Sequence, residues 1–369
     1  MKIGIDARLW QETGVGRYIR ALIYNLSVLD RKNDYYLFFR RQEFGSLSFP
    51  QNFKKILADI PWHSLEEQLR LPKIYKRARL DLLHIPYFSV PLLTPLPFIF
   101  TLHDLTISHF ATGRASSRLM PVYLIKRLGY KIVLDQAIRN SAKIIVPSRT
   151  VKQQLLTDYP KAAPKTTVIY EAGELETQTS HPDSDLHEKY LLYVGNAHPH
   201  KNLSALIHAF QKVIKDFPYL KLVLVGKKDF FYNRLLNQTE KLRFKGKIKV
   251  FYDLDNRALK NLYRNAQAFV FPSFSEGFGI PGLEAMWQKC PVIASDIVIF
   301  HEIYAQAAIY FNPMSADDLA DKIKAVLTNK KLNSELKQKG LLQAGNYSWT
   351  KMAKETLNVY ANCLGLRQN

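Results

Sequence analysis

The sequence predicts an α/β protein built from two doubly wound parallel sheets. Short apolar strands alternate with helical patterns along the whole chain, and strands buried on both faces need helical crossovers to join them. At 369 residues the chain is longer than one hydrophobic core usually serves. A polar stretch with one proline, ELETQTSHPDSDLHEK, separates the two halves of the pattern. We therefore expect an N-terminal domain over residues 1–182 and a C-terminal domain over residues 183–347.

The first half opens on an apolar strand, KIGIDA, which is followed by the helical pattern GRYIRALIYNLSVLD. Five further strands are predicted in this half: YYLFF, LLHIPY, FIFTLHD, KIIVPS and TTVIYE. The second half has the strands YLLYVG, KLVLVG, IKVFYD, AFVFPS and PVIASD, with the helices LSALIHAFQKVIKD, RALKNLYRNA and DDLADKIKAVLTN between them. Ligands of such sheets bind where strands end and helices begin, so the turns after the strands are the candidate sites.

The net charge is +20, and two segments of the first half are strongly basic. Between residues 111 and 157 the only acid is Asp135. The basic residues of this segment are Arg114, Arg118, Lys126, Arg127, Lys131, Arg139, Lys143, Arg149 and Lys152, and a second basic group is Arg70, Lys73, Lys76, Arg77 and Arg79. No nucleic-acid motif accompanies them. We expect a soluble basic surface, an anionic substrate or peripheral contact with an anionic membrane.

The location is predicted to be the cytoplasm, with a possible peripheral position at the inner face of the cell membrane. The N-terminus reads as a buried strand and carries no secretory h-region. The longest mostly apolar run, FSVPLLTPLPFIFTL, holds three prolines and is too short to cross a bilayer. Cys290 and Cys363 cannot form a disulfide framework.

Three turns carry weak signals. Gly14, Gly16 and Arg17 open a helix whose N-terminus could attract an anion, although a plain tight turn explains the glycines equally well. His103 ends a strand beside Asp104 and could be an oriented acid, base or donor, or could simply satisfy backbone groups. In the third turn, Gly195 and Asn196 precede a lysine, Lys201, that suits a phosphate or lies on the surface.

The fourth turn, FSEGFGIPGLEAM, is more informative because two acids flank a glycine-rich segment. Pro281 suits the first turn of a helix, which puts Glu284 one turn in and Glu276 in the preceding loop. Such acids do not flank one bond from opposite sides, as a glycosidase pair would. They suit two separate polyol groups, while the backbone N–H groups between them suit an anion. A nucleotide sugar has this order of groups, and two solvated acids around a turn are the alternative.

No metal site is expected. Asp253 and Asp255 have the spacing of a metal-binding pair, but Asp255 precedes a helical pattern and suits a helix N-cap.

At this segment the chain resembles a known family. The run NLYRNAQAFVFPSFSEGFGIPGLEAMWQKCPVIASDI closely resembles the donor-binding segment of family 4 retaining glycosyltransferases, which have the GT-B fold. Similar stretches follow in order along nearly the whole chain: IGIDARLWQETGVGRYIRAL, DLLHIPYF, FTLHDL, IIVPSRTVKQQLL, YLLYVGNAHPHKNL, LVLVGKKD and YSWTKMAKETLNVY. Within the family the chain is most similar to the mannosyltransferase-like branch that builds bacterial cell-surface polysaccharides.

The resemblance implies an interdomain cleft, an acceptor-binding N-terminal domain and a donor-binding C-terminal domain, with a last helix at about 348–369 that packs back on the first. It implies that Glu276 holds donor-sugar hydroxyls and Glu284 ribose hydroxyls, while the amides of Gly277, Phe278, Gly279 and Ile280 meet the sugar and diphosphate. By the same resemblance Lys201 and Gly16 lie at the diphosphate and His103 beside the reacting sugar. Base recognition is expected from backbone groups near Tyr252 to Leu254.

The implied reaction is metal-independent transfer of a hexose, with retention, from GDP-mannose or a UDP-sugar. The implied acceptor is a glycan or a polyprenyl-diphosphate-linked glycan, and no cofactor is expected besides the nucleotide sugar. One departure concerns Asn196 and His200, because many relatives carry an arginine at one of these positions. Either His200 is partly protonated or Arg17 compensates. A nucleotide-sugar epimerase of the same architecture and a non-catalytic basic binding protein are the alternative functions.

Overall fold

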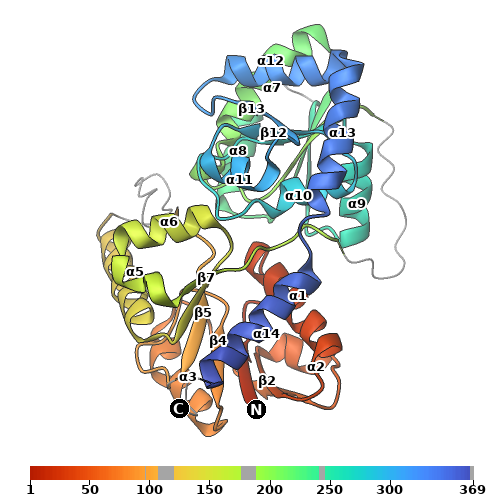
Figure 1. Ribbon diagram of the computed structural model, residues 1–369. Coiled ribbons are helices and arrows are strands. Elements are labelled where there is room, and N and C mark those ends of the chain that lie inside the picture. The colour runs from red at the N-terminus through yellow and green to blue at the C-terminus, as the bar shows by residue number, and fades with distance from the viewer. Residues whose placement is uncertain (96, 107–119, 176–187, 241–245, 366–369) are drawn as a thin grey trace. The chain divides into compact units, whose positions relative to one another are not determined.

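The computed structural model describes residues 1–95, 97–106, 120–175, 188–240 and 246–365 (Figure 1). These residues form two compact units. The first unit takes residues 1–106, 120–171 and 349–365, and the second takes residues 172–175, 188–240 and 246–348. The domain boundary predicted near Pro182 lies outside the described residues.

The first unit is built on a seven-stranded sheet in the order β3-β2-β1-β4-β5-β6-β7. Every neighbouring pair is parallel, as predicted from the continuous apolar strands. The strands are β1 (Lys2–Asp6), β2 (Asp34–Phe39), β3 (Phe53–Leu57), β4 (Leu82–Ile85), β5 (Phe98–Thr101), β6 (Lys143–Val146) and β7 (Thr166–Val168). Strands β4 and β5 are buried at every position, so the core of this unit lies on both faces of the sheet.

Helices cover the sheet of the first unit: α1 (Gly14–Leu29), α2 (Arg41–Ser46), α3 (Leu65–Arg77), α5 (Met120–Asn140), α6 (Arg149–Asp158) and α14 (Trp349–Gly365). Ser64 and Ser148 cap α3 and α6 by accepting hydrogen bonds from backbone N–H groups of the first turn. The last helix, α14, lies against α1, so the two ends of the described chain share one unit (Figure 1).

The second unit has a six-stranded parallel sheet in the order β10-β9-β8-β11-β12-β13. Its strands are β8 (Tyr190–Val194), β9 (Lys221–Gly226), β10 (Ile248–Tyr252), β11 (Ala268–Phe271), β12 (Val292–Ser295) and β13 (Ala308–Phe311). Its helices are α7 (Leu203–Asp216), α8 (Phe230–Glu240), α9 (Asn256–Asn265), α10 (Ile280–Trp287), α11 (Val298–Tyr304), α12 (Ala316–Thr328) and α13 (Lys330–Ala344). The central strands β8 and β11 are buried, which makes this a second doubly wound core.

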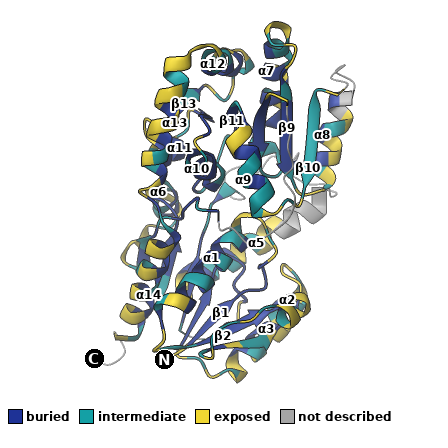
Figure 2. Ribbon diagram, turned by 90° about the vertical axis from the view of Figure 1, so that its right-hand side faces the viewer, coloured by how far each residue is buried: buried dark blue, intermediate teal, exposed yellow. Residues whose placement is uncertain are grey.

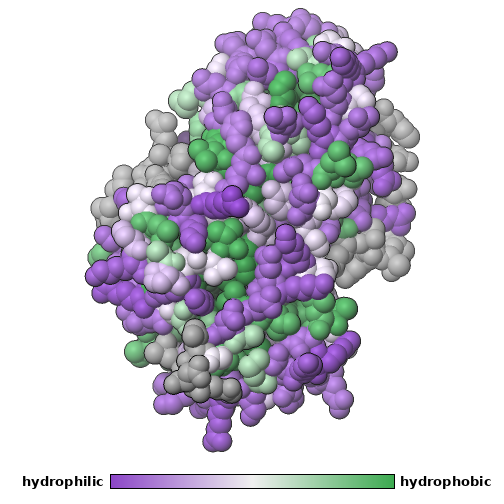
Figure 3. All heavy atoms as spheres, in the orientation of Figure 1, coloured by the Kyte–Doolittle hydropathy of each residue, from purple (hydrophilic) through white to green (hydrophobic). Residues whose placement is uncertain are grey.

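Colouring by burial shows the inner strands of both sheets as dark, the edge strand β10 as intermediate and the outer faces of the helices as exposed (Figure 2). On the face of the molecule seen in Figure 3, most side chains are hydrophilic and the hydrophobic ones gather in patches. Among the helices that the structure describes, none has the length and apolar character needed to span a bilayer. Of the basic group predicted between residues 111 and 157, Arg114, Arg118 and the side chain of Lys126 lie outside the described residues.

Candidate active site

The glycine-rich turn of the second unit has the predicted local structure. Strand β11 ends at Phe271, the chain turns, and α10 begins at Ile280 with Pro281 in its first turn. Glu276 therefore lies in the loop and Glu284 in the helix. Gly277 and Phe278 lie between the two acids, in the segment whose backbone N–H groups lead into the helix.

Glu276 and Lys201 form an ion pair within this unit. The distance from Lys201 Nζ to Glu276 Oε1 is 2.6 Å, and the two side chains are only 14% and 11% exposed. Ser273 Oγ donates a second hydrogen bond to the same carboxylate oxygen at 2.6 Å. Lys201 Nζ also lies 5.8 Å from the centre of the Phe271 ring. Two residues predicted separately for the donor site are thus in contact, and the pair has little access to water.

Glu284 is buried, with 1% of its surface exposed. The hydroxyl of Tyr263, on α9, donates to Glu284 Oε2 at 2.8 Å. Gly173 packs against the same helix, since a Cβ atom added there would lie 2.6 Å from the carbonyl carbon of Leu283 and 2.7 Å from the nitrogen of Glu284. Helix α10 and the tyrosine of α9 therefore hold this carboxylate in one place.

Two glycines of the turn are required by the Tyr304 side chain. The Tyr304 hydroxyl donates to the carbonyl of Gly279 at 2.6 Å. Gly279 has a left-handed backbone with φ of 104°, and a Cβ atom at Gly279 or at Gly282 would lie 2.3 Å from the Tyr304 oxygen. Any other residue at either position would displace Tyr304.

The third turn is held by two tyrosines. Tyr193 donates to the carbonyl of Asn196 at 2.6 Å, and Tyr232 donates to the carbonyl of Gly195 at 2.8 Å. Burial, with the neighbouring charge of Lys201, lowers the pKa of His200 to about 3. His200 is therefore neutral at pH 7 in this structure, so its partial protonation, one of the two expectations for the missing arginine, is not supported.

The segment before Leu254 has an unusual backbone. Asp253 adopts φ of 52°, in the left-handed region that non-glycine residues rarely occupy, and its N–H donates to the carbonyl of Gly226. Asp255 accepts a hydrogen bond from the N–H of Ala258 at 2.7 Å and caps α9, as predicted. In the described part of the chain, no three His, Cys, Asp or Glu side chains gather as metal ligands would.

In the first unit, His103 follows β5 and has a hydrogen-bond partner at each ring nitrogen. Nδ1 lies 2.8 Å from Glu171 Oε1, and Nε2 lies 3.1 Å from the carbonyl oxygen of Pro86. The centres of the His103 and Tyr18 rings are 5.0 Å apart, and the planes of the two rings are nearly perpendicular. Burial alone would lower the pKa of His103, but the hydrogen bond and charge of Glu171 outweigh it and raise the pKa above its ordinary value.

A chain of hydroxyl groups lies behind this histidine. The buried His84 of β4 is hydrogen-bonded through Nδ1 to the Tyr360 hydroxyl at 2.7 Å and through Nε2 to the Thr101 hydroxyl at 2.9 Å. The Thr101 hydroxyl is 3.2 Å from that of Tyr18. Burial lowers the pKa of His84 to about 3. The last helix, which carries Tyr360, is therefore connected by hydrogen bonds to the tyrosine that contacts His103.

The first turn begins α1 at Gly14. A Cβ atom at Gly16 would lie 2.6 Å and 2.7 Å from the carbonyl oxygens of Trp10 and Leu9, so the close approach of the backbone by itself requires this glycine. Nothing lies within 4 Å of a Cβ atom at Gly14, and Arg17 is half-exposed. Backbone packing therefore explains the glycine at position 16 without any ligand.

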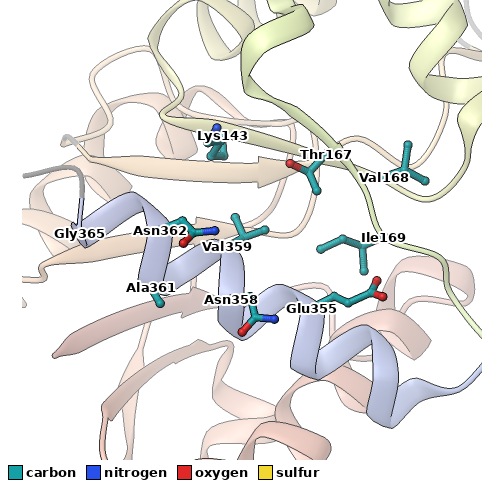
Figure 4. A pocket seen from close by; sticks show the side chains of 10 residues that line it. All are labelled: Lys143, Thr167, Val168, Ile169, Glu355, Asn358, Val359, Ala361, Asn362 and Gly365. Atoms are coloured by element: carbon teal, nitrogen blue, oxygen red, sulfur yellow. The ribbon is translucent and has the colours of Figure 1, made fainter.

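A hollow of about 600 Å³ lies elsewhere in the first unit, between β7 and α14 (Figure 4). Glu355, Asn358 and Asn362 line it from the helix, and Lys143 and Thr167 from the sheet. None of the residues predicted for the donor or catalytic site lines this hollow.

Two family models together match the chain from residue 13 to residue 343. "Glycosyltransferase Family 4" matches residues 13–175, and "Glycosyl transferases group 1" matches residues 176–343. The chain belongs to the family 4 glycosyltransferases.

Relatives of this glycosyltransferase carry mannosyltransferase names. The O-antigen chain mannosyltransferase RfbU of Salmonella typhimurium is 28% identical over 270 residues, which are 73% of this chain and 71% of the relative. O-antigen chain mannosyltransferase B of Escherichia coli is 31% identical over 46% of this chain and 45% of its own length. Phosphatidyl-myo-inositol mannosyltransferase of Mycobacterium tuberculosis is 29% identical over 48% of each chain.

Solved structures establish the GT-B fold of the glycosyltransferase. Sucrose-phosphate synthase from Thermosynechococcus elongatus has a TM-score of 0.79 at 19% identity, and the match covers 99% of this chain and all of that one. WaaG, a glycosyltransferase involved in lipopolysaccharide biosynthesis, has a TM-score of 0.77 at 14% identity, over 97% and 99% of the two chains. HepE of Anabaena in complex with UDP-glucose has a TM-score of 0.73 at 17% identity, over 98% and 100%.

Several residues that position the site of this glycosyltransferase were not predicted. Tyr263, Ser273 and Tyr304 contact the predicted residues of the second unit, and Glu171 contacts His103. The position of Glu171 directly after the strand pattern TTVIY was an available signal, because ligand-facing groups collect at strand ends. Ser273 closes the strand pattern AFVFPS and carried the same signal. Tyr263 and Tyr304 lie in the helices α9 and α11 and carry no comparable pattern.

Proposed function

We propose that this glycosyltransferase transfers a hexose, with retention and without a metal, from a nucleotide sugar to a glycan or polyprenyl-diphosphate-linked glycan of a cell-surface polysaccharide. GDP-mannose is the first candidate donor, and a UDP-hexose is the second. The observation that carries the proposal is the Lys201–Glu276 pair beside the α10 turn. The mannosyltransferase names of the relatives support the sugar, and their O-antigen names support the product.

The proposed donor site combines negatively charged carboxylates with positively charged groups along the turn. Glu276 accepts hydrogen bonds from hydroxyls of the sugar, and Lys201 beside it supplies the charge for the diphosphate. The N–H groups from Gly277 to Ile280 add the positive end of α10. Glu284, oriented by Tyr263, accepts the ribose hydroxyls, and the backbone near Leu254 meets the base.

The proposed chemistry needs no acid for the leaving group. A nucleotide diphosphate is already stable as an anion, so the chain has to stabilise charge and not to donate a proton. Lys201 and the N-terminus of α10 supply that stabilisation. Retention follows if the acceptor hydroxyl attacks the face that the leaving group vacates, with no carboxylate as nucleophile.

Thermal unfolding with GDP-, UDP- and ADP-sugars tests the donor. A ligand at 100 times its dissociation constant adds roughly 2.7 kcal/mol to the free energy of unfolding, which moves the midpoint by several degrees. We expect a shift with one nucleotide and its loss in Glu284→Ala. Donor consumption without any acceptor would point to an epimerase, and binding without transfer to any acceptor to a non-catalytic protein. No shift with any donor would contradict the proposed site.

We also propose that the first unit contacts an anionic membrane. On α3, Leu65 is 83% and Leu69 is 68% exposed, and in the loop after β4, Leu93 is 76% exposed. The N–H of Leu92 donates to Gln68 at 2.9 Å, so this loop lies beside α3. Exposed basic residues flank these leucines on α3: Arg70, Lys73, Lys76 and Arg77. Apolar side chains beside basic ones are typical of a helix that lies in the headgroup region.

Helix α5 repeats this combination. Leu128 is 61% and Ile132 is 49% exposed, next to the exposed Arg127 and Lys131. Sedimentation with vesicles that contain anionic lipid should pull down the wild type at low salt and lose Leu69→Glu and Leu93→Glu. Leu342→Glu, at an equally exposed leucine of α13 in the second unit, is the matched control and should still bind. Equal binding by all three variants would remove the proposed surface.

A further inference from the structure

The hydrogen bonds of His103 determine how many protons its ring carries. Its Nδ1 faces a carboxylate oxygen of Glu171 at 2.8 Å, and its Nε2 faces the carbonyl oxygen of Pro86 at 3.1 Å. A carbonyl and an ionised carboxylate only accept hydrogen bonds, whereas a neutral imidazole carries a single N–H. Both contacts are hydrogen bonds only if both ring nitrogens donate, which makes His103 an imidazolium ion.

His84, in the same unit, shows the opposite arrangement. Its two ring nitrogens face the hydroxyls of Tyr360 and Thr101, and each hydroxyl can donate or accept. A neutral ring satisfies both contacts there. Two histidines of one fold thus differ in charge because their partners differ in chemistry, and Glu171 is the partner that makes the difference at His103.

The groups around His103 favour the charged form. Glu171 is 4% exposed, so water weakens its attraction to the ring very little. Asp104 adds a second negative charge that raises the pKa of His103. Tyr18, whose ring meets that of His103, is uncharged because burial raises its pKa, and His84 is neutral. No positive charge among these neighbours opposes protonation.

We propose that Glu171 is a positioning residue of the transfer reaction, which holds His103 doubly protonated and in one orientation. The inference rests on the proposed function for the role of His103 beside the reacting sugar. With both nitrogens donating, His103 cannot accept the proton of an acceptor hydroxyl. It acts instead as a fixed positive charge, which stabilises negative charge that develops on the donor.

The nitrogen-15 NMR spectrum of the histidine rings tests the pair without reference to activity. The chain has ten histidines, so the signals of His103 are assigned by their absence from His103→Gln. We expect both ring nitrogens of wild-type His103 to be protonated at pH 7. In Glu171→Gln, which keeps the size and an acceptor oxygen, the pKa of His103 should fall by one pH unit or more, since a charge this close typically has that effect. Glu171→Asp should retain part of the elevation.

Glu174→Gln, which removes the same charge three residues further on, is the matched control and should leave the titration of His103 unchanged. A wild-type ring with one protonated nitrogen at pH 7, or a titration unaffected by Glu171→Gln, would overturn the proposal. The NMR titration needs neither a donor nor an acceptor, so it determines the protonation of His103 by itself. The proposed pairing of Glu171 with His103 can therefore fail independently of the proposed function.

Once a donor is identified, the pH profile of kcat/KM distinguishes a positioning role of Glu171 from a merely structural one. We expect wild-type kcat/KM to fall only at high pH, as His103 loses its second proton. In Glu171→Gln the fall should begin at lower pH, so the variant should regain activity as the pH is lowered toward 6. Loss of activity by the same factor at every pH would show that Glu171 serves only to fold the site.

Discussion

Lys201 Nζ lies 2.6 Å from Glu276 Oε1, in a setting where both side chains are nearly nine-tenths buried. The two residues are 75 positions apart in sequence, and each comes from a turn that follows a strand of the same sheet. The ion pair with Lys201 and the hydrogen bond from Ser273 hold the Glu276 carboxylate in one orientation before any ligand arrives. In the proposed donor site, this pair is preorganised for a donor that offers hydroxyls to Glu276 and phosphate oxygens to Lys201.

Breaking this pair should cost more than breaking one on the surface. Lys201→Met leaves Glu276 buried with only Ser273 to compensate, and we expect a loss of about 3 kcal/mol in the free energy of unfolding. The double variant Lys201→Met/Glu276→Gln should recover much of that loss. Denaturant unfolding measures both. Lys212→Met, which breaks the exposed pair with Asp317, is the control and should cost less than about 1 kcal/mol. The losses of Lys201→Met and of Glu276→Gln alone should not add up to the loss of the double variant. If they did, the two residues would not be energetically coupled.

Gly282→Ala should destabilise the second unit, because the new Cβ atom would lie 2.4 Å from Tyr304 Cζ as well as 2.3 Å from its oxygen. Overpacking of this kind typically costs about 1–3 kcal/mol, and the shift of Tyr304 would release Gly279 and weaken donor binding. Gly129→Ala, inside α5 with nothing within 4 Å, should stabilise by up to about 1 kcal/mol. Thermal unfolding measures both variants, and the midpoint should fall for Gly282→Ala and rise for Gly129→Ala. An unchanged midpoint in Gly282→Ala would mean that Tyr304 can move at no cost.

Acid should weaken the first unit through His84. The pKa of this ring is about 3 in the folded state and about 6.5 in an unfolded chain. The unfolded state therefore binds more protons below pH 6.5, and stability falls as the pH drops from 6.5 toward 3. At about 1.4 kcal/mol per pH unit, the loss is about 2 kcal/mol by pH 5. Unfolding of His84→Gln at pH 7.5 and 5 should show a smaller loss on acidification, while the exposed His208→Gln should behave as wild type.

His103 should act in the opposite direction. Because its pKa is raised in the folded state, the contribution of its pair with Glu171 is fully present below the unfolded pKa of about 6.5. It is lost as the pH rises through the folded pKa. As the pH rises above neutral, the free energy of unfolding of the first unit should thus fall less in Glu171→Gln than in the wild type. The same dependence on pH in both proteins would contradict the pairing.

Asn196→Arg should tighten nucleotide binding. The turn has Lys201 as its cation while His200 is neutral, and an arginine fork can bind phosphate oxygens in a bidentate way. We expect a severalfold lower Kd for the nucleoside diphosphate that the unfolding screen identifies, measured by titration calorimetry. Asn196→Gln controls for side-chain length. Unchanged affinity would indicate that the site has no need of a further positive charge.

The elements predicted correctly are those whose signal is local. A buried parallel strand is apolar at every position, so β8 and β11 are evident from their letters, and Pro281 places the start of α10. Strands β3 and β13, both at sheet edges, were not predicted. In β3, two lysines interrupt the apolar run of FKKIL, as on a half-exposed strand. In β13, AIYF is apolar at every position, so its letters did carry the signal of a strand.

The partners within the site could not be read from the sequence in the same way. The contact between Lys201 and Glu276 depends on the crossovers that place β8 and β11 side by side, and no short pattern encodes that distance. The neutral state of His200 follows from burial, which is a property of the packed fold and not of neighbouring letters. His103 was predicted as a site residue, but the carboxylate of Glu171 that is hydrogen-bonded to it is 68 positions away.

The position of α14 sets an order of events during synthesis. Met352, Ala353, Thr356 and Tyr360 are wholly buried in the first unit, yet the ribosome makes them more than 180 residues after the end of β7. At roughly 5–20 residues per second, the nascent first unit waits about 10–40 s for the helix that completes its core. All described residues of the second unit leave the ribosome within that interval. The half of the enzyme that is made first therefore finishes folding last, and it depends on its α1 surface remaining uncovered until α14 arrives.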